Sequence, residues 1–256
     1  MREVLHKESG RQYMWSGDPA YWGRVSPVLF PIVGRLKDDQ YKIDDQTYQL
    51  SQHGFLRDVD FELFEEAKDQ VVFQYQSNGR HTSQYPYEFT ARISYALSEN
   101  GLTISWEIVH EGDGTMYFSI GGHPAFHVPL VEGEQTDDYS LTLIPSTEHD
   151  PVQYELHDSL VREKEKGVEF EPIQLRPELF QNDAMIFSHI DQVSLTSQAV
   201  TALRSISVVF RSLVFGLHMI KKREQWLLLF VLSLGMGSLI WKGQTGSIRR
   251  NSAFKP

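Results

Sequence analysis

Residues 89–108 read FTARISYALSENGLTISWEI, and this stretch decides the fold. Apolar and polar residues alternate before the Glu99-Asn100-Gly101 segment, and the alternation resumes from Leu102 to Ile108. Successive side chains of a strand point to opposite faces, so a period of two is typical of half-buried strands. The Asn-Gly step between two such runs predicts a hairpin. Because Val71, Phe73 and Tyr75 repeat with the same period and no helical period of comparable length occurs nearby, we expect an all-β chain, a sandwich or a barrel.

A second stretch, residues 118–130, reads FSIGGHPAFHVPL. It begins as an alternating strand, and then two glycines stand directly before His123 and Pro124. Paired glycines in a strand favour a bulge or a close approach, and proline removes a ladder donor. The pattern therefore predicts that His123 lies at a break in a sheet, as a site residue would. A histidine packed in the core is the plainer alternative, and a metal site shared with His127 is a weaker one because no third ligand is nearby.

Three further polar residues are candidates for a site. Arg35 ends the proline-interrupted apolar segment 27–36, where it is either a solvated charge or a planar donor that reaches into a cavity. His53 precedes Gly54, which permits a turn with positive φ, so the imidazole can lie at a strand end; a surface histidine is the alternative. Asp183 separates two short apolar pieces, as a turn-former does, although its carboxylate could also accept sugar hydroxyls.

Residues 139–144 alternate as a strand does, and the charged stretch 146–176 is expected to be loop. The chain of 256 residues is long enough for one large domain, and 41% hydrophobic residues indicate a globular protein. The formal net charge of −10 argues against a nucleic-acid or anionic-membrane partner. The sequence contains no cysteine, and its first residues form no apolar signal core, so we expect a cytoplasmic protein.

These motifs together resemble the LacX-like branch of the aldose 1-epimerases, a galactose mutarotase-like family. The matching text is residues 22–35 (WGRVSPVLFPIVGR), 52–58 (QHGFLRD), 118–126 and 182–187 (NDAMIF), within about residues 10 to 210. The resemblance implies one domain over residues 1–256, a large antiparallel β-sandwich, lacking a strand that family members have before residues 8–15. It also implies interconversion of the α and β anomers of an aldohexose or a related sugar, without metal or organic cofactor. By position, His123 resembles the catalytic acid, and Arg35, His53 and Asp183 resemble residues that bind the sugar.

The C-terminal segment departs from the family. The family's catalytic base is a glutamate in a Cys-Ile-Glu-Pro-Trp-like strand, and Glu224 stands in a different context. Residues 211–256 hold eight basic residues and one acidic residue, although the whole chain is acidic. Permissible codons for residues 211–237, read two bases later, can spell FPGIWASYDKKEGAMAPFVCIEPWYG, which is close to the missing strand. The sequence therefore predicts a frameshift near Arg211.

Two functional hypotheses follow. The first is an aldose mutarotase that is impaired because the catalytic glutamate is absent. The second is a non-catalytic carbohydrate-binding or regulatory protein on the same fold. A sugar phosphate is a variant substrate for the first, because Arg24, Arg35 and Arg57 are available to bind an anion. Sequence spacing leaves the choice of sugar and the oligomeric state open.

Overall fold

The computed structural model describes residues 1–7, 9–98, 101–181, 183–197, 205–209, 213–222 and 225–240, and describes residues 205–240 by their backbone. The chain forms two compact units. Unit 1 comprises residues 1–28 and 121–235, and unit 2 comprises residues 29–120 and 236–256. The expectation of a single domain stays a prediction. In the part of the chain that is described, no helix is long and apolar enough to cross a membrane.

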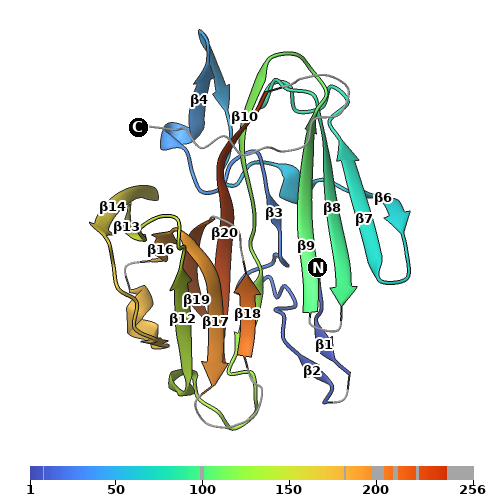
Figure 1. Cartoon of the computed structure of the whole chain (residues 1–256). Helices are drawn as coiled ribbons and strands as arrows, with labels where there is room; N and C mark the ends of the chain where they lie inside the picture. Colours follow the sequence, from blue (N-terminus) through green and yellow to red (C-terminus); the bar gives the residue numbers. More distant parts are fainter. Residues whose placement is uncertain are drawn as a thin grey trace. The chain divides into compact units, whose positions relative to one another are not determined.

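Unit 2 contains a four-stranded antiparallel sheet in the order β6-β7-β8-β9 (Figure 1). Its strands are Glu62–Glu66 (β6), Gln70–Gln76 (β7), Phe89–Ser98 (β8) and Gly101–His110 (β9). The predicted hairpin is confirmed, because β8 and β9 pair from Phe89↔His110 to Ser98↔Gly101. The apolar residues of the alternating pattern, Phe89, Ala91 and Ile93, are buried, and Thr90 between the first two is buried as well.

The remaining elements of unit 2 are short. They are the 3-10 turns Lys37–Asp39 (η1) and Leu56–Asp58 (η2), and the paired strands Gln40–Ile43 (β4) and Gln46–Gln49 (β5). Phe30 is fully buried in this unit, with its ring 4.8 Å from Phe89 and 5.5 Å from Phe118, measured between ring centroids. Apart from the two-residue strand Val28–Leu29, the proline-interrupted segment before Arg35 is an irregular connection.

Three strands lie at or near the unit boundaries that fall after residues 28 and 120. They are Val28–Leu29 (β3), Thr115–Gly122 (β10) and Ala125–Val128 (β11). Strand β10 ends at Gly122 and β11 begins at Ala125, so the break predicted at His123 and Pro124 is confirmed. Proline explains this break, since it has no N–H to continue a ladder.

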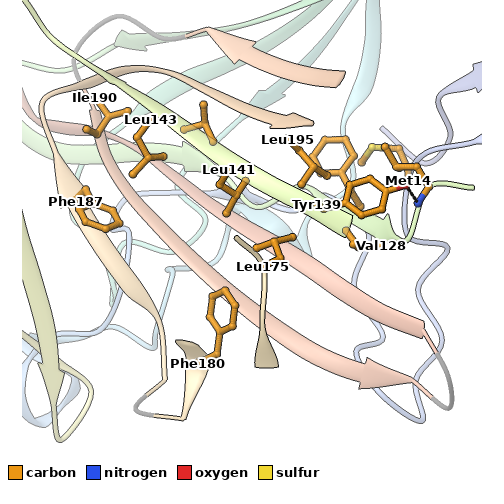
Figure 2. Close-up of a cluster of buried hydrophobic side chains, with 13 residues drawn as sticks. Met14, Val128, Tyr139, Leu141, Leu143, Leu175, Phe180, Phe187, Ile190 and Leu195 are labelled. Atoms are coloured by element: carbon orange, nitrogen blue, oxygen red, sulfur yellow. Dashed lines mark hydrogen bonds between the residues drawn. The ribbon is translucent and has the colours of Figure 1, made fainter. Parts of the chain in front are cut away.

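Unit 1 contains a four-stranded sheet in the order β15-β12-β17-β18. Its strands are Ile173–Gln174 (β15), Tyr139–Pro145 (β12), Ile190–Ser197 (β17) and Ser205–Val209 (β18). One face of this sheet supplies much of the unit's hydrophobic core, in which Leu141, Leu143, Val193 and Leu195 are each no more than 3% exposed. In Figure 2, Leu141 and Leu143 of β12 and Leu195 of β17 lie in one hydrophobic cluster with Phe180 and Phe187.

Further strands of unit 1 form the order β14-β13-β16-β19-β20, and β11 also pairs with β20. Their bounds are Val152–His157 (β13), Leu160–Lys166 (β14), Met185–Ser188 (β16), Leu213–Lys222 (β19) and Gln225–Ile240 (β20). Strand β20 belongs to unit 1 as far as residue 235. Unit 1 also has the two-residue strands Leu5–His6 (β1) and Arg11–Gln12 (β2), and the 3-10 turns Thr136–Asp138 (η3) and Pro177–Phe180 (η4).

The prediction that residues 146–176 form a loop is wrong. They contain the β13–β14 hairpin, which turns at Asp158 and Ser159 with positive φ at both residues. Most of β14 is exposed, so its sequence LVREKEK lacks the apolar alternation by which a half-buried strand is recognised.

The C-terminal segment that looks frameshifted forms strands where it is described. Strands β19 and β20 pair from Leu213↔Leu234 to Lys222↔Gln225, and Ala125 to Val128 of β11 pair with Leu229 to Trp226 of β20. The apolar run from Trp226 to Leu234 therefore lies within one strand. Glu224 and the basic tail from residue 241 lie outside the described residues. The frameshift itself stays a prediction.

Candidate functional site

His123 occupies the two-residue gap between β10 and β11 in unit 1. Its backbone N–H donates to the carbonyl of Pro27 at 3.0 Å, and Pro124 behind it favours an extended backbone. The imidazole lies against the indole of Trp22, with 4.9 Å between the ring centroids and 37° between the ring planes. The side chain is partly exposed. A half-buried imidazole on a fixed backbone can exchange a proton with a bound molecule.

His127 belongs to a different set of contacts. It lies in β11, its backbone N–H donates to the carbonyl of Tyr13 at 3.1 Å, and its ring meets the edge of Trp15 at 5.8 Å between centroids. Among the residues that the structure describes, no group of three or more histidine or carboxylate side chains could hold a metal ion.

His53 is joined to Gly34 by two hydrogen bonds in unit 2. The His53 N–H donates to the Gly34 carbonyl at 2.8 Å, and the Gly34 N–H donates to His53 Nδ1 at 3.0 Å. A neutral imidazole that accepts at Nδ1 carries its proton on Nε2. His53 is therefore held as a donor at Nε2, which suits the oxygen lone pairs of a sugar.

The turn that holds His53 requires the glycine after it. His53 and Gly54 both have φ of +65°, and the backbones of Phe30 and Gly54 form an isolated parallel bridge. A Cβ on Gly54 would lie 2.2 Å from the Phe30 carbonyl oxygen. The predicted turn with positive φ at Gly54 is thus confirmed, and the close contact is a second reason for a glycine there.

Arg35 follows Gly34 directly, but its guanidinium is occupied in this structure. Nε and Nη2 donate to the two oxygens of Asp39 at 2.9 and 2.8 Å, and the Arg35 side chain is 46% exposed. The hydrogen bond from Arg35 lowers the pKa of the Asp39 carboxyl, and the same pair raises the pKa of Arg35. This geometry corresponds to the solvated-charge alternative, and a role for Arg35 in sugar binding stays a prediction.

Asp183 is the last of the predicted residues. It is exposed, has φ of +73°, and lies between η4 and β16, where its N–H donates to the carbonyl of Phe180 at 3.2 Å. The predicted separation of two apolar pieces at Asp183 is confirmed, because η4 ends before it and β16 begins after it. Asp183 is a turn residue by geometry, and its role toward a sugar stays a prediction.

The structure thus brings the predicted residues together in part. Gly34 connects His53 with the backbone before Arg35 in unit 2, while His123 and Asp183 belong to unit 1. The sequence also predicts that Arg35, His53 and His123 converge on one concave face, and this stays a prediction. Sequence reasoning missed the contact between Trp22 and His123, which are separated by about 100 residues of chain. The only signal was the position of Trp22 in one of the family motifs.

Comparison with known proteins identifies the family. A family model described as aldose 1-epimerase matches residues 3–174. The chromosomal and plasmid LacX proteins of Lactococcus lactis subsp. lactis are each 30% identical to this chain over 220 residues, covering 80% of the chain and 72% of each relative.

Solved structures show the fold. A galactose mutarotase related enzyme from Lactobacillus acidophilus matches with a TM-score of 0.83 and 31% identity, covering 92% of this chain and 79% of that chain. A galactose mutarotase-like protein from Lactobacillus casei matches with a TM-score of 0.71 and 26% identity, covering 90% and 80%. The predicted all-β, galactose mutarotase-like architecture with antiparallel sheets is therefore confirmed. The chain belongs to the aldose 1-epimerase family.

Proposed function

We propose that this scaffold is that of an aldose 1-epimerase, which interconverts the α and β anomers of an aldohexose by acid–base ring opening. The observation that carries the proposal is the placement of His123, a partly exposed imidazole held at a strand break in a chain of this family. Arg35, His53 and Asp183 are proposed to bind the sugar hydroxyls and the ring oxygen. The substrate is a small sugar, and the protein is proposed to act in the cytoplasm.

The reaction needs two proton transfers. A base removes the proton of the anomeric hydroxyl while an acid protonates the ring oxygen, and the bond between C1 and the ring oxygen breaks. Rotation about the C1–C2 bond followed by ring closure gives the other anomer, and both protons return. Imidazole titrates near neutral pH, so His123 can give and retake the ring-oxygen proton. The Nε2–H of His53 can donate a hydrogen bond to a substrate oxygen.

The base is the missing half of this mechanism. In family members it is a glutamate near the C-terminus, and residues 211–256 contain no matching motif. We therefore propose that the chain as printed is impaired. A version that continues after Phe210 in the alternative reading frame would recover the glutamate.

The same observation favours a second candidate, a non-catalytic carbohydrate-binding or regulatory protein. A site that retains hydrogen-bond donors but lacks the base can still hold a sugar. The two candidates differ in one measurable respect, because only the epimerase accelerates anomer exchange once the glutamate is present.

Polarimetry on freshly dissolved glucose or galactose tests the proposal. In the alternative-frame version, His123→Ala should lower the rate of anomer exchange by about 10²-fold or more, the usual scale for a positioned acid. His157→Ala is the matched control, because His157 is an exposed histidine of β13 paired with Glu155. An unchanged rate in His123→Ala would remove His123 from the mechanism. Sugar binding without acceleration by either version would favour the binding protein.

A further inference from the structure

Trp15 is a buried anchor beside the gap that holds His123. Its side chain is 1% exposed and packs on Ala125, the first residue of β11. The backbone N–H of Trp15 donates to the Ala125 carbonyl at 3.0 Å, and Met14 bridges to Phe126. Trp15 is therefore fixed to the strand that begins two residues after His123.

The same indole reaches the backbone of Trp22. Nε1–H of Trp15 donates to the Trp22 carbonyl at 2.7 Å. On the other side, the Trp22 N–H donates to the carbonyl of Asp18 at 2.9 Å, and the Asp18 carboxylate accepts the N–H of Ala20 at 3.0 Å. Both backbone polar groups of Trp22 are thus bonded, which restricts the backbone from which its side chain extends.

The Trp22 ring then lies on the imidazole of His123, with 4.9 Å between the centroids. The backbone of His123 is held by Pro27 and restricted by Pro124, but an imidazole still turns about two side-chain torsions. A flat ring packed on one face restricts those torsions. The contact therefore acts on the part of His123 that its backbone does not control.

We propose that Trp22, held in place by Trp15, is a positioning residue that sets the orientation of the His123 imidazole. The proposal rests on the proposed function, because orientation matters for catalysis only if His123 transfers a proton. Misplacing a reacting group by about 1 Å can cost 10²-fold in rate, so a partial loss of orientation is expected to cost about tenfold.

The first test needs no activity. Proton–carbon spectra of the chain labelled with ¹³C-histidine contain signals from ten histidines, and His123→Ala identifies the signal of His123. Because the imidazole lies against the indole, we expect the Trp22 ring current to displace that signal upfield. We expect Trp22→Leu to abolish the displacement and Trp22→Phe to retain much of it, since phenylalanine keeps a flat aromatic face. Trp106→Leu, which removes an indole from β9, should leave the signal in place.

Two outcomes would overturn the proposal. The first is a His123 signal that does not move in Trp22→Leu, and the second is one that moves as far in Trp106→Leu as it does in Trp22→Leu. If Trp22→Leu does not fold, Trp15→Phe decides the question. It keeps a buried ring but deletes the N–H that donates to the Trp22 carbonyl, so the proposal requires the His123 signal to move.

The second test separates positioning from catalysis. In the alternative-frame version, Trp22→Leu should lower kcat about tenfold with little change in KM, and Trp22→Phe should restore most of the loss. A normal kcat in Trp22→Leu, together with a strong loss in His123→Ala, would refute positioning while the proposed function stands. If the His123 signal moves in Trp22→Leu but His123→Ala keeps a normal rate, the proposed function is refuted instead.

Discussion

Replacing Gly54 by alanine tests how the turn at His53 is held. Gly54 has φ of +65°, and its new Cβ would lie 2.2 Å from the oxygen and 2.6 Å from the carbon of the Phe30 carbonyl. A left-handed conformation costs an L-residue about 1–2 kcal/mol. Overpacking against backbone that must shift costs about 1–3 kcal/mol more. We therefore expect Gly54→Ala to lower the free energy of unfolding by about 2–5 kcal/mol.

The matched control is Gly79→Ala. Gly79 has φ of +75°, but a Cβ there would meet nothing within 4 Å. This variant should lose only the conformational part, about 1–2 kcal/mol. Urea unfolding, followed with the same probe in both variants, measures the difference. With slopes of roughly 1–3 kcal/mol per molar urea, the midpoint of Gly54→Ala should lie about 1 M below that of Gly79→Ala. Equal midpoints would refute the argument that the close contact with Phe30 requires a glycine.

Three further predictions follow from other contacts. The hydrogen bond from Arg35 lowers the pKa of Asp39, so the pair's contribution to stability is present at neutral pH and is lost as the pH falls through the folded pKa of Asp39. Arg35→Gln should raise the pKa of Asp39 in a carboxyl NMR titration. An unchanged pKa would contradict the pairing. The Tyr139 hydroxyl donates to Glu134 and accepts the N–H of Leu130. Tyr139→Phe should therefore lower the free energy of unfolding by about 2–4 kcal/mol. An unchanged free energy of unfolding would show that water replaces the hydroxyl. The chain as printed should accelerate mutarotation little and the version reframed at residue 211 strongly, and equal activity at equal folded concentration would show that the base lies elsewhere.

The raised pKa of Tyr139 also predicts that the stability of the fold decreases at alkaline pH. Burial, and then the hydrogen bond to Glu134, raise the pKa of the phenol above its usual value. A raised folded pKa means that the folded state keeps its proton longer than the unfolded state does. The associated stability is present below the ordinary tyrosine range and is lost as the pH rises through the folded pKa.

The sequence predicted those features that depend on neighbouring residues. The β8–β9 hairpin follows from alternation on both sides of an Asn-Gly step, and the gap at His123 follows from Pro124. The left-handed turn at His53 follows from Gly54. Each of these features is encoded within a few residues.

The missed features depend on tertiary contacts or on the position of a strand in a sheet. Trp22 meets His123 across about 100 residues, and no spacing rule predicts which ring will cover which imidazole. Arg35 could have pointed into a cavity, but the nearby Asp39 supplies a bidentate partner in this structure. Strand β14 was missed because the pattern used to recognise strands is that of a half-buried one.

Strand β14 begins the order β14-β13-β16-β19-β20, and it has a consequence for solubility. The row of N–H and C=O groups along an outermost strand can template the addition of a strand from another molecule. The side chains of Arg162 to Lys166 are exposed and alternate in charge, with Lys166 Nζ 3.3 Å from Glu163 Oε1. A strand from another molecule that paired with β14 would have to displace the water that solvates these charged side chains. The charged residues that make the sequence of β14 unlike that of a half-buried strand therefore also protect unit 1 from aggregation by strand pairing at this edge.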